Sequence, residues 1–141
     1  MTTTLDGLKV ALSAEEAAVW AYPLVGAKVS TGYQSVVAKA HGVHQMRVAE
    51  LSGRLAALRA DVPDPAAAYS LPFPVTNSAS AIKLAVHLED GVSAGWRYLV
   101  AAAETAELRR YAVAQLAACA LQSMRWRGRA HLTLTQAFPG T

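Results

Sequence analysis

Apolar residues recur at spacings of three and four along four long segments of the chain, which is the pattern of a helix that buries one face. The first segment covers about residues 3–29, the second about 35–59, the third about 78–103 and the fourth about 105–127. No run alternates Val, Ile or Thr with polar residues, as a half-buried strand would. The pattern therefore predicts an all-α fold.

Local signals mark the ends of the first two helices. Thr3 or Thr4 can cap the first helix, and Asp6 suits the positive end of its dipole. Pro23 lies inside the first pattern and has no N–H to donate, so a kink or a break is expected near Tyr22. The second helix is expected to end before Pro63, because proline disfavours helix in the residue that precedes it.

The connection between the second and third helices is long and rich in proline, and it covers about residues 61–78. We expect its apolar residues to pack across the surface of the bundle; these are Tyr69, Leu71, Phe73 and Val75. The other two connections are short. Two helix hairpins joined by a long crossover are the connectivity of a ferritin-like four-helix bundle. We expect residues 1–141 to form one such domain, with an irregular tail at about 128–141.

Composition and charge bear on where in the cell the protein is expected and on whether it associates with a membrane. The chain has 141 residues, 53% hydrophobic content and a formal net charge of +3. Its single cysteine, Cys119, cannot form an internal disulfide, and a reducing cytoplasm is the simplest fit. No uncharged run is long enough to span a membrane, so neither an anchor nor a targeting segment is expected.

The local excess of positive charge lies at Arg125, Arg127 and Arg129. With Trp126 between them, these arginines could contact nucleic acid. Cationic residues are also favoured at the C-terminus of a helix, and Gly128 suits a C-cap. We favour the cap and surface interpretation, so nucleic acid is not an expected partner.

Four polar residues fall on the inward faces of the predicted helices. They are Glu15 on the first, His41 and His44 on the second, and Glu89 on the third. Buried carboxylates need partners, because an unpaired buried charge is costly. Carboxylates and imidazoles at the centre of a four-helix bundle are typical of an iron or manganese site. The alternative is a metal-free network in which the carboxylates pair with protonated histidine or with Arg47.

The residues of the fourth helix bear on the choice between a metal site and a metal-free network. This helix has no Glu, Asp or His between Leu108 and Met124. Only Gln115, Cys119 and Gln122 remain, and amides are poor ligands. A complete two-metal site is therefore disfavoured. A site for one iron or manganese ion, formed by Glu15, Glu89 and one histidine, stays open behind the metal-free network; His44 is the preferred histidine and His41 the weaker one.

Five segments of the chain form a recognisable set: 12–22 (LSAEEAAVWAY), 44–47 (HQMR), 69–75 (YSLPFPV), 88–90 (LED) with Trp96, and 126–127 (WR). Together these segments resemble a small actinobacterial ferritin-like family of unassigned function. The resemblance implies a ferritin-like bundle with Glu15, His44 and Glu89 at family positions. This chain departs from the family where it has Glu15-Glu16 in place of Glu-His and Arg47-Val48 in place of Arg-Asp.

These observations lead to two functional hypotheses. The first is a non-catalytic binding or interaction protein on a ferritin-like scaffold with a degenerate metal site; its small-molecule ligand is not identified. The second is an iron- or manganese-dependent oxidase or hydroxylase that uses Glu15, His44 and Glu89, with Tyr22 nearby. We expect a homodimer. Trp20 lies off the apolar stripe of its helix, where either a second copy or the proline-rich connection could cover it.

Overall fold

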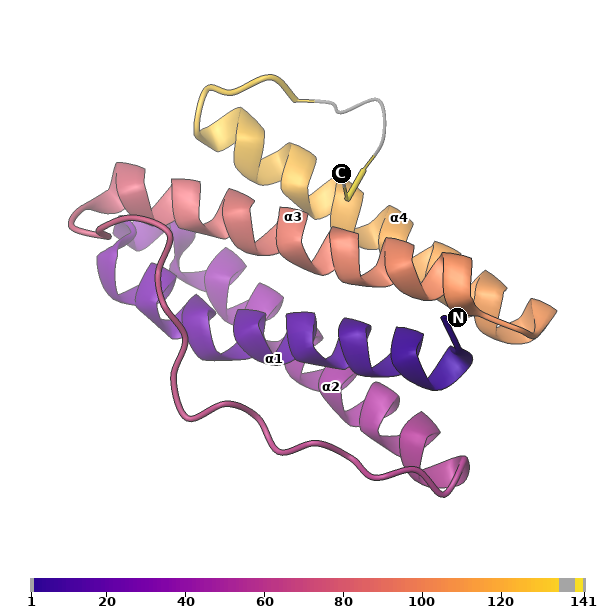
Figure 1. Cartoon of the computed structure of the whole chain (residues 1–141). Helices are drawn as coiled ribbons and strands as arrows, with labels where there is room; N and C mark the ends of the chain where they lie inside the picture. Colours follow the sequence, from indigo (N-terminus) through magenta and orange to yellow (C-terminus); the bar gives the residue numbers. More distant parts are fainter. Residues whose placement is uncertain (1, 135–138, 141) are drawn as a thin grey trace.

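The computed structural model describes residues 2–134 and 139–140 of the chain. Its helices are α1 (Thr4–Lys28), α2 (Gln34–Ala57), α3 (Ser78–Ala102) and α4 (Ala106–Arg129), and a short 3₁₀ turn, η1 (Thr31–Tyr33), precedes α2 (Figure 1). The described residues contain no strand. The all-α prediction is confirmed, and each helix begins and ends within about two residues of the predicted limits.

Helix α1 begins after a capping residue and contains a proline. The Thr3 side chain accepts a hydrogen bond from the Asp6 N–H, while Asp6 bonds back to the Thr3 N–H, which forms a capping box. The helix then continues through Pro23 to Lys28. The break expected near Tyr22 is therefore wrong, and the kink stays a prediction. A hydrogen bond from His41 of α2 to the Val19 carbonyl, which Pro23 cannot bond, accompanies the continuous helix.

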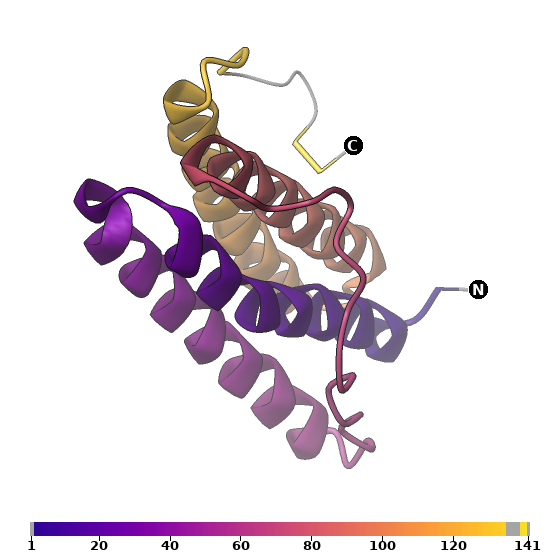
Figure 2. The same ribbon diagram turned by 90° about the vertical axis from the view of Figure 1, so that its left-hand side faces the viewer.

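The helices lie side by side in the order α2, α1, α3, α4 (Figures 1 and 2). Helices α1 and α3 are antiparallel, since Thr4 at the start of α1 donates to the Ala102 carbonyl at the end of α3. Gly7 and Gly95 allow this close approach. A Cβ at Gly7 would lie 2.8 Å from the Ala102 Cβ, and one at Gly95 would lie 2.9 Å from the Ala14 Cβ.

The connection between α2 and α3 crosses the outer side of α1 (Figure 1). The ring of Tyr69 lies 5.6 Å from that of Trp20, and Phe73 and Val75 are half-buried against the core. Leu71 is 38% exposed, so the packing prediction is wrong for that residue. Of the two interpretations of Trp20, the structure supports cover by this connection.

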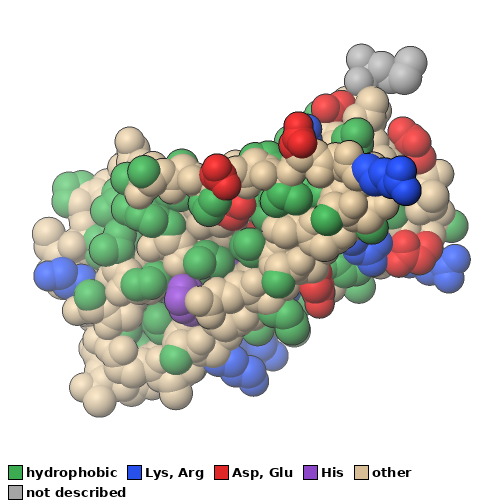
Figure 3. Space-filling view, turned by 90° about the horizontal axis from the view of Figure 1, so that it is seen from below, with side chains coloured by type: hydrophobic (Ala, Val, Ile, Leu, Met, Phe, Trp, Pro, Cys, Tyr) green, Lys and Arg blue, Asp and Glu red, His purple; other side chains and the backbone are tan. Residues whose placement is uncertain are grey.

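The face of the molecule opposite to the top of Figure 1 carries side chains of mixed character. Seen from below, hydrophobic side chains are interrupted by acidic and basic ones (Figure 3). Within the described residues, no helix is both long enough and apolar enough to cross a membrane.

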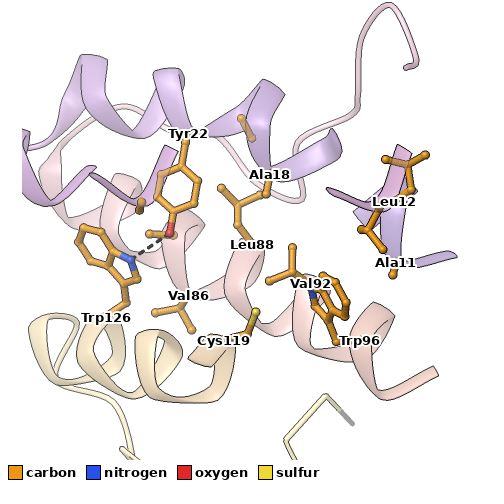
Figure 4. Packing of buried hydrophobic residues seen from close by; sticks show 14 of the residues in the cluster. Ala11, Leu12, Ala18, Tyr22, Val86, Leu88, Val92, Trp96, Cys119 and Trp126 are labelled. Atoms are coloured by element: carbon orange, nitrogen blue, oxygen red, sulfur yellow. Dashed lines mark hydrogen bonds between the residues drawn. The ribbon is translucent and has the colours of Figure 1, made fainter. Parts of the chain in front are cut away.

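The core contains two tryptophans and a tyrosine that are fully buried: Trp96, Trp126 and Tyr22 (Figure 4). Trp126 Nε1 donates to the Tyr22 hydroxyl at 3.0 Å, which joins α4 to α1 through the interior. Cys119 is fully buried in the same core. Aromatic side chains with polar atoms are stable in a core only when those atoms find partners. The hydrogen-bond partners of these buried aromatic side chains lie at the polar centre of the bundle.

Candidate functional site

Three of the predicted site residues meet at the centre of the bundle. Glu15 comes from α1, His44 from α2 and Glu89 from α3, and their side chains are 0%, 1% and 1% exposed. His44 Nδ1 is bonded to Glu15 Oε2, while Nε2 lies 2.9 Å from Glu89 Oε1. The imidazole therefore bridges the two carboxylates.

Aromatic donors extend this bridge at both ends. Trp96 Nε1 donates to Glu15 Oε1 at 2.6 Å. Tyr22 donates its hydroxyl hydrogen to Glu89 Oε1 at 2.5 Å, and its ring stacks on that of His44 with centroids 5.3 Å apart. With the contact from Trp126 to Tyr22, the network reaches all four helices.

Arg47 supplies a second buried positive charge near this network. Its Nη1 lies 3.7 Å from Glu15 Oε1, and its Nε donates to Gln115 Oε1 on α4 at 2.9 Å. Two carboxylates thus face one guanidinium and one imidazole. If His44 is protonated, the buried charges sum to zero, which limits the cost of burying them.

The environment of His44 favours its protonated form. Burial lowers the pKa of the imidazole, but the hydrogen bonds to Glu15 and Glu89 and the charges of both carboxylates outweigh burial and raise the pKa to about 9. Burial, followed by the charge of Glu89, raises the pKa of Tyr22 well above its ordinary value, so its hydroxyl keeps its proton.

His41 lies outside this network, in contrast to the predicted inward position. It is half-buried, and its Nε2 lies 3.0 Å from the Val19 carbonyl oxygen. A carbonyl only accepts, so Nε2 carries the hydrogen. Val19 is four residues before Pro23, whose missing N–H would otherwise bond this carbonyl. His41 therefore has a structural role that explains why α1 continues through its proline.

The residues that meet at the centre do not fit a metal site. Both ring nitrogens of His44 are already engaged, on opposite sides of the imidazole, so the two carboxylates do not converge with it on one point. Across from them α4 offers Gln115 and the buried Cys119, and Gln115 is bonded to Arg47. Among the described residues, no group of three or more His, Cys, Asp or Glu side chains is arranged to hold a metal ion. The donor set is that of a hydrogen-bonded network.

Side-chain hydrogen bonds join α2 to α4 near the end of α2 and the start of α4. Arg54 forms two hydrogen bonds with Glu107, at 3.0 and 3.2 Å, and its guanidinium lies 3.9 Å from the centre of the Tyr111 ring. Tyr111 donates to Glu50 at 2.6 Å, and the bond from Arg47 to Gln115 follows one turn further along. Nearer the start of α2, no hydrogen bond joins the two helices within the described part of the chain.

A cleft of about 420 Å³ opens where α2 and α4 separate. His44 and Glu89 lie in its lining, so the cleft reaches the central network. Its apolar lining consists of Val36, Ala40, Val43, Ala118 and Leu121, and its cationic lining of Lys39, Arg47, Arg125 and Arg129.

Two buried polar atoms of cleft residues have no hydrogen-bond partner among residues 2–134 and 139–140. They are Glu89 Oε2 and Arg129 Nη1. Buried polar atoms are normally paired, and an unpaired one lowers stability. Arg129 is held in place by aromatic rings, since its guanidinium lies 4.9 Å from the ring centre of Trp126 and 5.8 Å from that of Tyr33.

The arginine cluster near the end of α4 divides between two environments. Arg127 pairs with Asp90 at 2.5 Å, whereas Arg125 and Arg129 line the cleft. The assignment of all three to a cap or plain surface is thus incomplete, and Gly128 is not the cap: α4 continues to Arg129 and Ala130 follows as its C-cap. The four-residue spacing of Arg125 and Arg129 on one helical face was the sequence signal for their shared location.

Comparisons with known proteins agree with this fold. The family described as "Domain of unknown function (DUF4439)" matches residues 7–141. The chain is also similar to the crystal structure of a conserved hypothetical protein, rv2844, from Mycobacterium tuberculosis, with 33% sequence identity and a TM-score of 0.86. That match covers 89% of this chain and 96% of the other. A search of curated proteins found no match.

Proposed function

We propose that this chain, which belongs to the DUF4439 family, is a non-catalytic protein that binds a small molecule in the cleft between α2 and α4. The scaffold in this proposal is a ferritin-like four-helix bundle. Its connectivity supports that assignment, because two helix hairpins are joined by a long crossover between Ala57 and Ser78. Fold alone does not assign a function, so the proposal rests on the cleft.

One observation carries the proposal: Glu89 lines the cleft, and its oxygen Oε2 is buried and has no partner among the described residues. The rest of the central network is internally paired. A volume of about 420 Å³ is also in the range of sites that enclose small organic ligands. A bound ligand would satisfy the oxygen that the protein leaves free.

The metal-dependent oxidase or hydroxylase is the less well supported alternative. It requires Glu15, His44 and Glu89 to direct free lone pairs at one ion. In the network, both nitrogens of His44 are instead directed at carboxylate oxygens. A metal-free network that stabilises the bundle, with a binding cleft beside it, accounts for more of the observed contacts than a metal site does.

We also infer a cytoplasmic, single-domain homodimer. Cytoplasmic location is supported by the one cysteine, which is buried and has no disulfide partner. In such a dimer the subunit contact avoids Trp20, because Tyr69 already covers that side chain. Light scattering on the eluting protein would test the assembly, with twice the 14.9 kDa of one chain as the expected mass.

Two neighbouring alanines on α4 offer a direct test of binding in the cleft. Ala118 lines the cleft, whereas Ala117 is exposed outside it. The fluorescent probe 1-anilinonaphthalene-8-sulfonate, which combines an anion with apolar rings, should bind the unchanged protein saturably. Ala118→Trp should block that binding and Ala117→Trp should leave it intact. Equal binding by both variants, or no saturable binding by the unchanged protein, would overturn the proposal.

A further inference from the structure

The polar groups of the α2–α4 cleft specify the chemistry of its ligand. We infer that the cleft takes a small organic anion, a carboxylate or phosphate, that carries a hydroxyl or ammonium donor and a hydrocarbon body. This inference rests on the proposed function, because it names the class of molecule that the cleft would bind.

The cationic lining calls for an anion. Lys39, Arg125 and Arg129 line the cleft, and none of them has an ion pair within the described residues. Arg129 is held in place by Tyr33 and Trp126, yet its buried Nη1 donates to nothing in the described chain. A fixed guanidinium with a free N–H suits a carboxylate or phosphate oxygen.

Glu89, the one acidic residue in the described lining of the cleft, requires a hydrogen-bond donor from the ligand. Glu89 Oε1 already accepts from Tyr22 and contacts His44, whereas Oε2 has no partner in the described chain. A carboxylate oxygen only accepts, so its partner must bring a hydrogen. A purely apolar ligand would leave Glu89 Oε2 and Arg129 Nη1 buried and unpaired, which is unfavourable. A hydroxyl or ammonium group on the ligand removes this cost.

The remaining wall of the cleft is apolar. Ala40 and Val43 of α2 face Ala118 and Leu121 of α4 across it. Leu121 is 43% exposed although it is a large hydrophobic residue, so a bound hydrocarbon chain would remove its surface from water. The ligand class therefore combines three parts that match the cationic, acidic and apolar parts of the lining.

A set of related probes separates these contributions by calorimetric titration. The reference probe is 3-hydroxydecanoate; decanoate lacks the hydroxyl, 1,3-decanediol lacks the anion, and decyl phosphate replaces the carboxylate of decanoate by a phosphate. We expect the reference probe to bind about tenfold more tightly than decanoate and than the diol, since each loses one charge-assisted hydrogen bond. Comparing decyl phosphate with decanoate identifies which anion the cations prefer.

Two double variants, which change the net charge of the protein by the same amount, test the cations of the cleft. Lys39→Gln with Arg125→Gln removes two cations of the cleft. Lys28→Gln with Arg110→Gln removes two exposed cations elsewhere, and it is the matched control. The cleft pair should weaken 3-hydroxydecanoate about tenfold or more and leave the diol unchanged, while the control pair should stay within about twofold of the unchanged protein.

The outcomes distinguish the ligand class from binding itself. Equal affinity for the diol and the hydroxy acid, or equal effects of the two variant pairs, would overturn the ligand class. So would failure of all four probes while 1-anilinonaphthalene-8-sulfonate still distinguishes Ala118→Trp from Ala117→Trp. If that distinction is also absent, the proposed function fails with it.

Discussion

His41 on α2 donates a hydrogen bond to the Val19 carbonyl on α1, with 3.0 Å between Nε2 and the oxygen. This carbonyl lies four residues before Pro23, so it lacks the N–H that would bond it in an uninterrupted helix. A side chain from the neighbouring helix thus replaces a missing backbone donor. The same contact removes His41 from the central network, where its position in the sequence had suggested it would lie.

The contribution of His41 should depend on Pro23. We expect His41→Ala to reduce the free energy of unfolding by about 1–2 kcal/mol, because it leaves the Val19 carbonyl without a donor. In a Pro23→Ala background the backbone supplies an N–H, and the same substitution should cost much less. Urea unfolding of the four proteins forms a double-mutant cycle with an expected coupling of about 1 kcal/mol.

The exposed histidine of α3 provides the control for this cycle. His87→Ala should show no coupling to Pro23→Ala, because His87 is exposed and its ring lies against Phe73 of the connection between α2 and α3. If His41→Ala has the same effect with and without Pro23, then His41 does not compensate for the proline.

The stability of the protein should fall as the pH rises through the range in which His44 loses its proton. The folded state raises the pKa of His44 from 6.5 to about 9, so the group stabilises the fold fully below pH 6.5, and this contribution declines up to about pH 9. At about 1.4 kcal/mol per pH unit, the largest loss is about 3 kcal/mol. Urea unfolding at intervals between pH 6 and 9 would measure it.

Removing the titrating group should remove this dependence. His44→Gln is expected to be less stable at pH 6 and to show a nearly flat profile up to pH 9, whereas His87→Gln should keep the slope of the unchanged protein. A slope that persists in His44→Gln would assign the pH dependence to another group.

The helices of this fold were predictable because their signals are local. The apolar spacing predicted a second helix at about 35–59 and a third at about 78–103, close to the observed Gln34–Ala57 and Ser78–Ala102. The inward face is also a local property of each helix, which is why Glu15, His44 and Glu89 could be selected. His41 was misassigned because residues three apart on a helix differ by about 60° in direction. It points toward α1 rather than the centre.

The cleft could not be predicted in the same way. Its width depends on how α2 and α4 diverge from the contact of Arg54 with Glu107, and these residues are far apart in the sequence. The sequence alone predicts Arg125 and Arg129 to be surface residues at a helix end, because nothing near them in the sequence indicates an opening opposite their face. How two helices that are not consecutive in the chain lie relative to each other depends on the packing of the whole bundle.

The connection over α1 should shield Trp20 from solvent. Trp96 and Trp126 are fully buried, so Trp20 is the tryptophan whose exposure Tyr69 controls. Tyr69→Ala should increase quenching of tryptophan fluorescence by acrylamide and reduce the free energy of unfolding by about 1 kcal/mol. Leu71→Ala, at an exposed position of the same connection, should change neither; equal quenching in both variants would show that Tyr69 does not cover Trp20.

The central network should bind no iron or manganese in stoichiometric amounts. We expect elemental analysis of protein from cells supplied with both metals to give the same low content for the unchanged protein and for the variant Glu15→Ala with Glu89→Ala. That variant should be less stable by about 3–5 kcal/mol, because it leaves buried His44 without its carboxylates.

The single variant Glu89→Gln, which preserves shape, allows the comparison if the double variant does not fold. One metal ion per chain that disappears in either variant would restore the oxidase or hydroxylase hypothesis, since metal binding would then have rearranged the bridge that His44 makes between the two carboxylates.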